Sequence, residues 1–579
     1  MDVFLIVLWL CIIGSAAWAI WKYFTKVGPL MIVLSGVLAM TSTAADYLVA
    51  QTANGSTNSM STANGAAFWA ALNAGDTVHI YGDISTNLII QKSGIPGSPI
   101  TITFENGARM VRDTWGTLSA YLPAGNVPFA DSAIRTDPQN VPFHDLTINN
   151  ARVETTNNGF GKIYTNGFYC MWLYADANIS INGMVVTNCQ NYTGATNAYT
   201  CSNCGDLNQW YKYPPASITG IRCEGANTNT SITGGNFDNC GNSIYLVHSG
   251  GSSFAAPPTA QFIILSNHFT RYNWAIGKLQ SVDNSRCLNS RVAYNWMDCS
   301  TNWDFSPNAN NSQNPNHGDG IFWSTGNQTN CLDINPRFEG NYVGPYLSSL
   351  SSAALLYVDA TGSSLKFTNM VVVGNIVNTT NPAYGTSVPK ILVNGDSTKI
   401  INNTILGSVG TYDANPTFYT NFAFGTALVL NAEDPTAGAV VIANNIIGNC
   451  YDNIARLTHL AKFPTNSDYN IYFYTATNTA YSGSAPSFGT QLLGSGTSLF
   501  PGWTNASLQD FHGNTNNPII NPITFAAFTN SYAGTNYLDV SAYGVTNRFI
   551  GAVNPGNTNS TPPSGSGPAA FRFFGRIAP

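Results

Sequence analysis

The motif that decides the fold of this chain reads Gly340-Asn341-Tyr342-Val343 in one copy and Gly374-Asn375-Ile376-Val377 in the next. It is an asparagine at the end of a short β-prone run, followed within two residues by an apolar side chain. A period of roughly 20 to 50 residues is typical of stacked repeats, and the asparagines of seven copies are spaced 31, 28, 46, 34, 28 and 42 residues apart. They are Asn236, Asn267, Asn295, Asn341, Asn375, Asn403 and Asn445.

The runs between these asparagines predict a β-solenoid. Segments such as Met370-Val371-Val372-Val373 and Ala439-Val440-Val441-Ile442 read as short strands, and helical periodicity is nearly absent. Each rung of a solenoid needs only its neighbours, so insertions at a turn explain the uneven spacing. Asparagine suits a fixed turn position because it tolerates a left-handed φ, and stacked asparagine side chains can hydrogen-bond along the stack. A β-propeller, the main rival, would show more regular four-strand blades.

The N-terminal part of the chain carries a resemblance to a known group. The segments GAAFWAALNAGDTVHI (65–80) and SGIPGSPITI (93–102) resemble the beginning of right-handed parallel β-helix proteins of the pectin-lyase-like group. The resemblance implies a short helix over Ala66 to Leu72 that covers the otherwise adhesive edge of the first rung. Ser467 to Phe473 and Asn547 to Ala552 resemble the last rungs of the same group.

The predicted fold class is therefore all-β, a single-stranded right-handed parallel β-helix with a short N-terminal capping helix. The predicted organisation has four parts. Residues 1–45 form a transmembrane and/or signal segment, residues 46–130 the cap and first rungs, residues 131–555 the β-helix, and residues 556–579 a flexible linker with an aromatic-basic tail.

Composition excludes several classes of protein. The chain has 579 residues, of which only 9% are charged, and its net charge is −6. Nucleic-acid binding needs clustered Lys and Arg to displace counterions, and the sequence has no such cluster, so we expect no nucleic-acid partner. Disorder needs low hydrophobicity and high net charge, which a hydrophobic share of 44% argues against.

The first 45 residues read as a membrane or signal segment. Val3 to Trp21 is a stretch of 19 residues without a charge, just long enough to span a bilayer as a helix. A second apolar run, Leu30 to Met40, precedes Ser42-Thr43-Ala44, which fits a small-residue cleavage site. Three interpretations stay open. The true start codon lies later than Met1 and a signal peptide follows it, a membrane helix precedes a signal peptide, or both segments form a membrane hairpin through residues 3–40. All three place the rest of the chain outside the cytoplasm, secreted or at the cell surface.

Cysteine usage agrees with export. Ten of the 11 cysteines lie between Cys170 and Cys450, and an even number in an exported region predicts disulfides. Three pairs are close in sequence, although spacing does not fix the pairing: Cys201/Cys204, Cys223/Cys240 and Cys287/Cys299. The first pair has the spacing of zinc ligands but no second pair or His pair beside it, so a structural role is the favoured reading.

Charged and aromatic side chains concentrate between Arg271 and Arg337. In a chain with so few charges this cluster points to a sugar site, because pyranose C–H faces stack on aromatic rings beside carboxylates. The candidate catalytic residues are Asp319, His317, Asp304 and Lys278, and the candidate substrate-binding residues are Arg271, Arg337, Trp303 and Trp323.

The sharpest motif in this region is Asn316-His317-Gly318-Asp319-Gly320-Ile321. It follows a long polar loop (302–316) and precedes an apolar run, so Asp319 is expected at a junction between a turn and a strand. The motif partly resembles the Asp-Gly element of polygalacturonases. The paired-Asp, Gly-His-Gly and Arg-Ile-Lys elements of those enzymes are absent, as is the pectate-lyase signature, so the resemblance does not extend to either activity.

Two mechanisms and one structural reading stay open. A glycosidase would pair Asp319 with a second carboxylate, Asp304 or Asp298, as acid and as base or nucleophile. A lyase would use Lys278, His317 or an arginine to remove a proton beside a uronate carboxylate, which cations or bound Ca²⁺ would neutralise. No other cofactor and no metal site are expected. In the structural reading, Asp-Gly is a common turn pair and the tryptophans serve packing.

We therefore expect an exported β-helix protein that binds or cleaves a polysaccharide, with a lyase or glycoside hydrolase site near Asp304–Asp319. The first rival is a non-catalytic carbohydrate-binding adhesin. The second is a spike, or receptor-binding, protein of a virus or phage. The chain is expected to be a monomer or a homotrimer, and a trimer would favour the spike.

Overall fold

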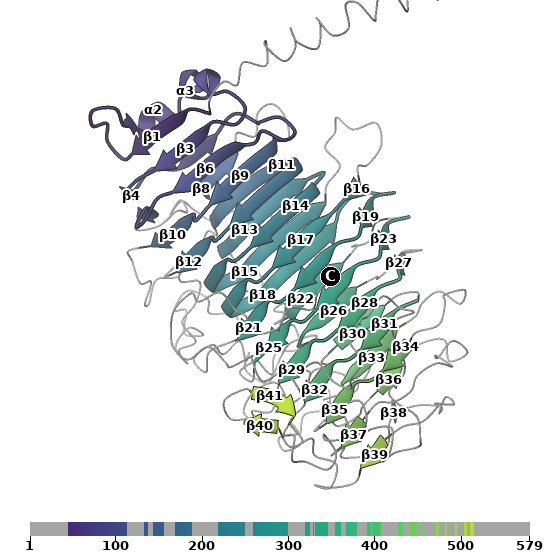
Figure 1. Ribbon diagram of the computed structural model, residues 1–579. Coiled ribbons are helices and arrows are strands. Elements are labelled where there is room, and N and C mark those ends of the chain that lie inside the picture. Colours follow the sequence, from purple (N-terminus) through teal and green to yellow (C-terminus); the bar gives the residue numbers. More distant parts are fainter. Residues whose placement is uncertain are drawn as a thin grey trace, which may run out of the picture.

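The chain forms a stack of parallel strands, a parallel β-helix, with its N-terminal rungs at the purple end of the ribbon (Figure 1). The predicted all-β parallel β-helix is thus confirmed. The computed structural model describes residues 44–112, 132–136, 143–155, 168–187, 218–248, 259–298, 319–324, 328, 330–344, 354–359, 366–378, 391–394, 397–406, 427–431, 441–448, 454–456, 471–473, 481–482, 492–494, 503–505 and 510–513.

Four columns of parallel strands form the walls, and we call them sheets 1 to 4. Sheet 1 contains β1 (Asp46–Ala50), β3 (Thr77–Ile80), β6 (Ile100–Phe104), β9 (Phe143–Asn149), the second half of β11 (Phe168–Asn182), β14 (Thr228–Thr233), β17 (Phe262–Leu265), β20 (Arg291–Ala293), β24 (Arg337–Glu339), β28 (Val371–Val373), β31 (Lys399–Ile401) and β34 (Val441–Ala443). Sheet 2 contains β4 (Asp83–Ile84), β7 (Arg109–Arg112), β10 (Arg152–Thr155), β12 (Val185–Thr187), the first parts of β15 (Asn236–His248) and β18 (His268–Gln280), β21 (Trp296–Asp298), β25 (Tyr342–Val343), β29 (Ile376–Asn378), β32 (Thr404–Leu406), β35 (Ile446–Gly448), β37 (Ile471–Phe473) and β39 (Leu492–Gly494).

Sheet 3 follows sheet 2 along each rung. It contains β5 (Leu88–Ile90), β8 (Ser132–Thr136), the first half of β11, β13 (Ile218–Gly225), the later parts of β15 and β18, β22 (Asp319–Ser324), β26 (Leu356–Asp359), β30 (Ile391–Asn394), β33 (Leu428–Asn431), β36 (Ile454–Arg456) and β38 (Tyr481–Ser482). The short sheet 4 contains β16 (Thr259–Ala260), β19 (Arg286–Leu288), β23 (Leu332–Ile334) and β27 (Lys366–Thr368). Outside the four sheets, β2 (Asn58–Ser59) pairs with β1, and β40 (Trp503–Asn505) pairs antiparallel with β41 (Asp510–Gly513).

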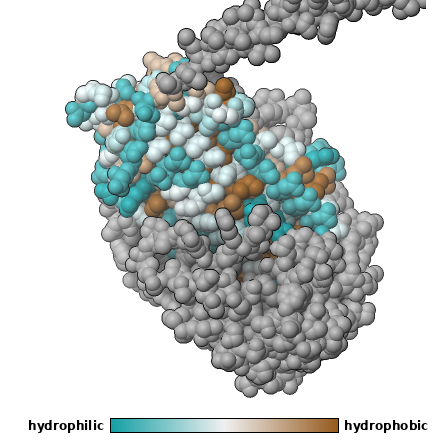
Figure 2. All heavy atoms as spheres, in the orientation of Figure 1, coloured by the Kyte–Doolittle hydropathy of each residue, from teal (hydrophilic) through white to brown (hydrophobic). Residues whose placement is uncertain are grey.

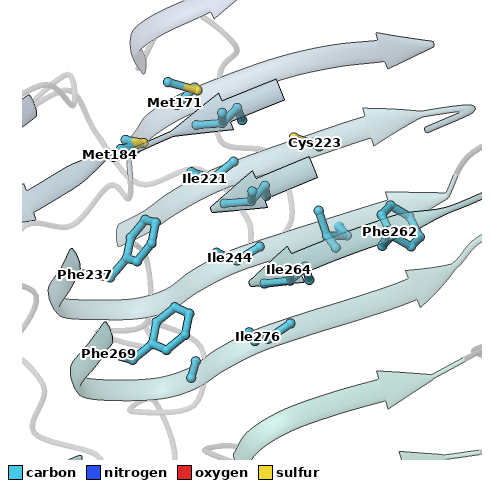
Figure 3. Packing of buried hydrophobic residues seen from close by; sticks show 14 of the residues in the cluster. Met171, Met184, Ile221, Cys223, Phe237, Ile244, Phe262, Ile264, Phe269 and Ile276 are labelled. Carbon is cyan, nitrogen blue, oxygen red and sulfur yellow. The ribbon is translucent and has the colours of Figure 1, made fainter. Parts of the chain in front are cut away.

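Alternation along each strand gives the β-helix an apolar interior. In sheet 1 every rung contributes one apolar residue to a column that points inward. On the last described rungs of this sheet the flanking positions are apolar as well, and they form a separate buried cluster of Val371, Val373, Ile401, Val441 and Ala443. Figure 3 shows part of the resulting core, where Phe237 and Phe269 lie one above the other with ring centroids 5.3 Å apart. The inward column of sheet 1 is Val78, Ile102, Ile148, Ile181, Ile232, Ile264, Val292, Phe338, Val372, Ile400 and Ile442, all buried.

A two-residue turn joins sheet 1 to sheet 2, and its second residue forms what we call the asparagine ladder. Each side-chain amide Nδ2 donates to the Oδ1 of the next asparagine at 2.9 to 3.0 Å, and the backbone N–H donates to the same oxygen. Every amide also donates to a carbonyl of a neighbouring rung. The predicted stacking of asparagines is confirmed for Asn267, Asn295, Asn341, Asn375, Asn403 and Asn445, all buried.

The first residue of this turn has a left-handed backbone, which explains why glycine and asparagine recur there. The residues with positive φ at this position are Asn150, Gly183, Gly234, Ser266, Tyr294, Gly340, Gly374, Asn402 and Asn444.

The ladder begins at Asn267 and not at Asn236, so the sequence prediction was wrong for that rung. Asn236 pairs in register with His268, one position beyond the ladder. The ladder position is Gly235, whose N–H donates to Asn267 Oδ1 at 2.8 Å. A Cβ there would lie 2.5 Å from Cε2 of Phe237, so the ring of Phe237 occupies the space that a ladder side chain would need.

Two short helices lie beside the first rungs, α2 (Met60–Ala63) and α3 (Ala66–Ala71) (Figure 1). Alanine-rich sequence favours α3, which falls where the sequence predicts a helix. The rings of Phe68 and Trp69 are buried in the main core cluster, and Tyr47 of β1 packs edge-on against Phe68. This contact seats the helix on the first strand. That the helix serves as a cap stays a prediction.

Several predictions about the ends of the chain lie outside the described residues. These are the segment 3–40, the cleavage site, the last-rung segment 547–552 and the tail 556–579. In the part of the chain that the structure describes, no helix is long and apolar enough to cross a bilayer. The boundaries at residues 130 and 555 also stay predictions.

The predicted disulfides do not form among the described cysteines. Cys223 and Cys240 are free thiols, and so is Cys287. Cys223 is fully buried, and this burial raises the pKa of its thiol to about 12. These cysteines therefore behave as small apolar core residues.

Figure 2 shows one face of the molecule, where hydrophilic and weakly polar residues predominate over the first rungs and hydrophobic ones form only small patches.

Candidate functional site

The outer surface of sheet 3 carries a continuous strip of large side chains. Hydrogen-bonded register places Trp172 beside Arg222, Arg222 beside Tyr245, and Phe322 beside Tyr357. Their neighbours on the same strands, such as Ile221 and Ile244, point inward to the core (Figure 3). All members of the strip are half-buried, so each keeps part of its surface exposed. We call this set the aromatic strip: Trp172, Arg222, Tyr245, Trp274, Phe322 and Tyr357.

The centre of the aromatic strip is a run of parallel rings. The rings of Trp274 and Phe322 lie 4.6 Å apart at 5°, and those of Phe322 and Tyr357 lie 5.5 Å apart at 9°. Tyr245 meets Trp274 at 6.0 Å and 49°. Because these rings stack face to face on successive strands, their edges point outward in one line and form an extended apolar platform of ring edges.

A glycine makes this stack continuous. Gly277 occupies the outward position between Tyr245 and Phe322 in register. A Cβ there would lie 3.0 Å from Cε3 of Trp274 and 3.2 Å from Cδ2 of Tyr245. The missing side chain therefore leaves the space into which the indole of Trp274 leans.

Arg222 anchors the N-terminal part of the strip. Its guanidinium lies 5.3 to 5.5 Å from the ring centroids of Tyr169, Trp172 and Tyr245. It also donates to Glu224 Oε2 at 2.8 Å and to the Tyr169 hydroxyl at 3.2 Å. Cation–π contacts of this kind hold a planar cation flat between rings.

The phenols beside Arg222 stay neutral. Burial raises the pKa of Tyr169 and of Tyr245 above the ordinary value, although Arg222 acts in the opposite direction. Both hydroxyls can therefore donate as well as accept hydrogen bonds at neutral pH.

Asp319 lies at one edge of this platform. It begins β22, and its register partner is Trp274. The strand side of the predicted junction is thus observed, while the turn before it lies outside the described residues. Asp319 is fully buried, and the adjacent Gly320 lies so close to the next rung that a Cβ would meet the Ala354 carbonyl oxygen at 2.8 Å. Its backbone thus pairs with that of Trp274, while its carboxyl group has no exposed surface, so a role for Asp319 in a sugar site stays a prediction.

Lys278 and Trp323, by contrast, lie in the interior of the β-helix. Both side chains are fully buried. Lys278 Nζ donates to Asp333 Oδ2 and to Gln280 Oε1, each at 2.8 Å, and Trp323 Nε1 donates to the same Asp333 oxygen at 2.7 Å. An ammonium group enclosed in this way cannot reach a polymer bound outside, and the indole of Trp323 packs at right angles against Phe338.

The remaining predicted residues are scattered. Arg337 lies on sheet 1, on a different wall from Asp319. Arg271 belongs to β18, but its side chain is outside what the structure describes, as are Trp303, Asp304 and His317 entirely. Within the described ranges, no group of three or more His, Cys, Asp or Glu could hold a metal ion.

Sequence reasoning missed the strip itself. Arg222 and Tyr357 lie outside the cluster of Arg271 to Arg337, and Trp172 lies a hundred residues before it. One signal was available, because Phe322 alternates with Ile321 and Trp323. Period-two alternation places Phe322 on the opposite face from its two neighbours.

The class that the fold defines is thus a parallel β-helix. No family model matches the chain, and no curated protein matches it in sequence. A mannuronic acid specific polysaccharide family 6 lyase from human gut microbiota is a similar solved structure, with 12% identity over 77% of this chain and 82% of that chain and a TM-score of 0.39. A lacto-N-biosidase from Eubacterium ramulus has 11% identity over 81% and 71%, with a TM-score of 0.34. The Dettilon tailspike protein has 14% identity over 72% and 61%, with a TM-score of 0.30. The function proposed for this chain therefore rests on its own side chains.

Proposed function

We propose that this chain binds a polysaccharide along the aromatic strip of sheet 3. The observation that carries the proposal is the parallel stack of Trp274, Phe322 and Tyr357, whose outer surfaces stay partly exposed. Sugar rings have apolar C–H faces and polar edges, so an aromatic platform beside hydrogen-bonding groups suits them. Arg222 and Glu224 supply such groups at one end of the strip.

The dimensions of the strip favour a polymer over a single sugar. It crosses six successive strands, from β11 through β13, β15, β18 and β22 to β26. Five steps of roughly 4.8 Å give a length of about 24 Å. A chain of several sugar rings can contact such a strip at many points, and weak contacts at each ring then add up.

Cleavage of the bound polysaccharide is the finer part of the proposal. Asp319 is the predicted carboxylate on β22, the strand that also carries Phe322 of the strip, and Asp304 is its predicted partner in a glycoside hydrolase. In the lyase alternative, the base falls to His317 or an arginine, because Lys278 is held in the core by Asp333. The non-catalytic alternatives, an adhesin or a virus or phage spike, share the strip and lack the cleavage. Export to the cell surface is likewise part of the proposal.

A glycan panel tests both levels. The full chain is incubated with acidic and neutral polysaccharides, and binding, new reducing ends and the ultraviolet absorbance of unsaturated uronates are followed. We expect binding to at least one glycan that is lost in Trp274→Ala and kept in Tyr81→Ala, since Tyr81 is an exposed aromatic residue outside sheet 3, directly after β3. If the wild type forms a cleavage product and Asp319→Asn does not, the chain is an enzyme. An unsaturated product would make it a lyase, and a saturated product with new reducing ends would make it a hydrolase.

Two outcomes would contradict the proposal. Binding that survives Trp274→Ala would show that the strip is not the binding site. Absence of binding across the whole panel would contradict polysaccharide binding altogether. Binding without any product would contradict only the enzyme proposal and would favour an adhesin or a spike.

A further inference from the structure

A second feature of the outer surface lies on sheet 1, where cations gather. Arg291 of β20 and Arg337 of β24 are register partners, and Lys399 of β31 stands in the same column two strands beyond Arg337. The residue between Arg337 and Lys399 is Val371. Because valine is much shorter than arginine or lysine, the column is hollow at this point.

This hollow is a pocket of about 430 Å³. Uncharged polar side chains form its remaining wall, and no acidic residue lines it. Its lining consists of Asn289, Ser290, Arg291, Asn335, Arg337, Asn369, Val371 and Lys399. A space of this size holds a small anion or one charged sugar ring.

One buried carboxylate orients the two guanidinium groups. Glu339 Oε2 accepts from Arg337 Nε at 3.0 Å and from Arg291 Nε at 3.1 Å, while Tyr294 donates to Glu339 Oε1. The Glu339 side chain is only 7% exposed, against 39% for Arg291 and 30% for Arg337. The acid therefore lies beneath the cations, and a ligand approaching from outside meets the cations.

The arginines also keep free donors. Among the described residues, both Nη nitrogens of Arg337 and Nη1 of Arg291 have no hydrogen-bond partner. Planar guanidinium donors fit the oxygen atoms of carboxylate and sulfate groups in bidentate fashion. Register places the two guanidinium groups on adjacent strands, where like charges repel, and Glu339 is the acid that both contact.

Charge balance distinguishes this pocket from another arginine cluster on the same molecule. On sheet 2, Arg109 is bound by Asp83 and Glu154, and Arg152 also contacts Glu154, so two cations meet two acids. At the pocket, Arg291 and Arg337 meet the single acid Glu339 in the part of the chain that is described. These three side chains therefore sum to one positive charge, whereas the four of the sheet 2 cluster sum to zero.

We propose that the pocket formed by Arg291, Arg337 and Lys399 binds the oxyanion group of an acidic glycan, a carboxylate or a sulfate ester. The pocket lies on sheet 1 and the aromatic strip on sheet 3, so this site is separate from the proposed polysaccharide platform. The oxyanion site rests on the pocket alone, and the choice of a glycan as its carrier rests on the proposed function. A glycan that wraps from one wall to the other could use both.

Calorimetric titration of the full chain tests this site. The probes are sodium sulfate, a trimer of galacturonic acid, the methyl ester of that trimer and a neutral glucose trimer. We expect the galacturonate trimer to bind and its uncharged ester not to bind. Arg337→Gln and Lys399→Gln should each weaken binding about tenfold, which corresponds to about 1.4 kcal/mol. Arg109→Gln removes the same charge from the balanced cluster and should leave binding unchanged.

The outcomes separate the two sources of oxyanion and the two proposals. Sulfate binding that is lost in Arg337→Gln supports a sulfated ligand, and galacturonate binding lost in the same variant supports a carboxylated one. Equal binding of the ester, an equal loss in Arg109→Gln, or binding of neither anion would overturn the site. Phe322→Ala, which alters the aromatic strip, should leave sulfate binding intact, so a failure of the strip and a failure of the pocket are distinguishable.

Discussion

The interior and the exterior of this β-helix both contain columns of stacked polar or aromatic side chains, and they differ in what those side chains contact. Inside, the asparagine ladder and the Lys278–Asp333 pair make their hydrogen bonds to other residues of the chain. Outside, Trp274, Phe322 and Tyr357 stack on each other and keep part of their surface exposed. Stacked side chains whose hydrogen bonds are all made within the chain stabilise the fold, whereas stacked side chains with exposed surface are available to a ligand.

The largest effect is expected from breaking the interior ion pair. Lys278→Met leaves Asp333 as a buried charge without its counter-ion, and loss of one partner of a buried pair costs about 3 to 5 kcal/mol. Chemical denaturation should show this loss. The double variant Lys278→Met with Asp333→Leu should recover most of it, because no charge remains buried. A double variant as unstable as the single one would show that the pair is needed for more than mutual neutralisation.

The next largest effect is expected from interrupting the asparagine ladder. Asn341→Ala removes the acceptor for the backbone N–H and side-chain amide of Asn295, and leaves buried donors unpaired. Each buried unsatisfied group costs about 1 to 3 kcal/mol, so we expect a loss near 3 kcal/mol. The matched control is Asn182→Ala, which breaks half-buried side-chain bonds to Asn149 and Thr233 at a position without a left-handed backbone, and should cost less. Equal losses for the two variants would refute the distinction between interior and exterior columns.

A smaller effect on stability, but a clear one on binding, is expected for the aromatic strip. Gly277→Val places a side chain where the indole of Trp274 lies, and so should displace Trp274 from the stack. Glycan affinity should fall about tenfold, or about 1.4 kcal/mol, with a shift in tryptophan fluorescence. Unchanged affinity together with an altered fluorescence spectrum would show that the stack is not the binding surface.

The smallest effect concerns pH and involves His79 on the outside of sheet 1. Burial alone would lower the pKa of His79, but hydrogen bonds to Glu105 and Asp46 outweigh it and raise the pKa above the ordinary value. A raised folded-state pKa contributes stability that is fully present below about pH 6.5 and is lost as the pH rises through the folded-state value. Wild type should therefore lose a small increment of stability over this range that His79→Gln does not lose. A parallel pH dependence in both proteins would contradict this account.

The sequence predicted the interior columns well because their causes are local. Left-handed turn residues precede each ladder asparagine, and a buried apolar residue occupies the inward position of each adjacent strand of sheet 1. The alanine-rich segment before Gly75 likewise predicted α3 within one residue of its observed end.

The outer columns could not be predicted, because their register depends on loops of unequal length. Trp172 and Arg222 are neighbours although they lie 50 residues apart, whereas Phe322 and Tyr357 are neighbours at 35. The prediction that Lys278 belongs to the active site was wrong for a similar reason. Its partner Asp333 lies 55 residues away, and an isolated lysine reads as a surface residue until that acid is known.

The most direct test of the central claim is a crystal structure of the chain with an oligosaccharide that it binds in the glycan panel. The account predicts sugar rings lying over Trp274, Phe322 and Tyr357, in line with the stack of parallel strands. A glycan bound elsewhere, with these three rings still exposed to solvent, would contradict it.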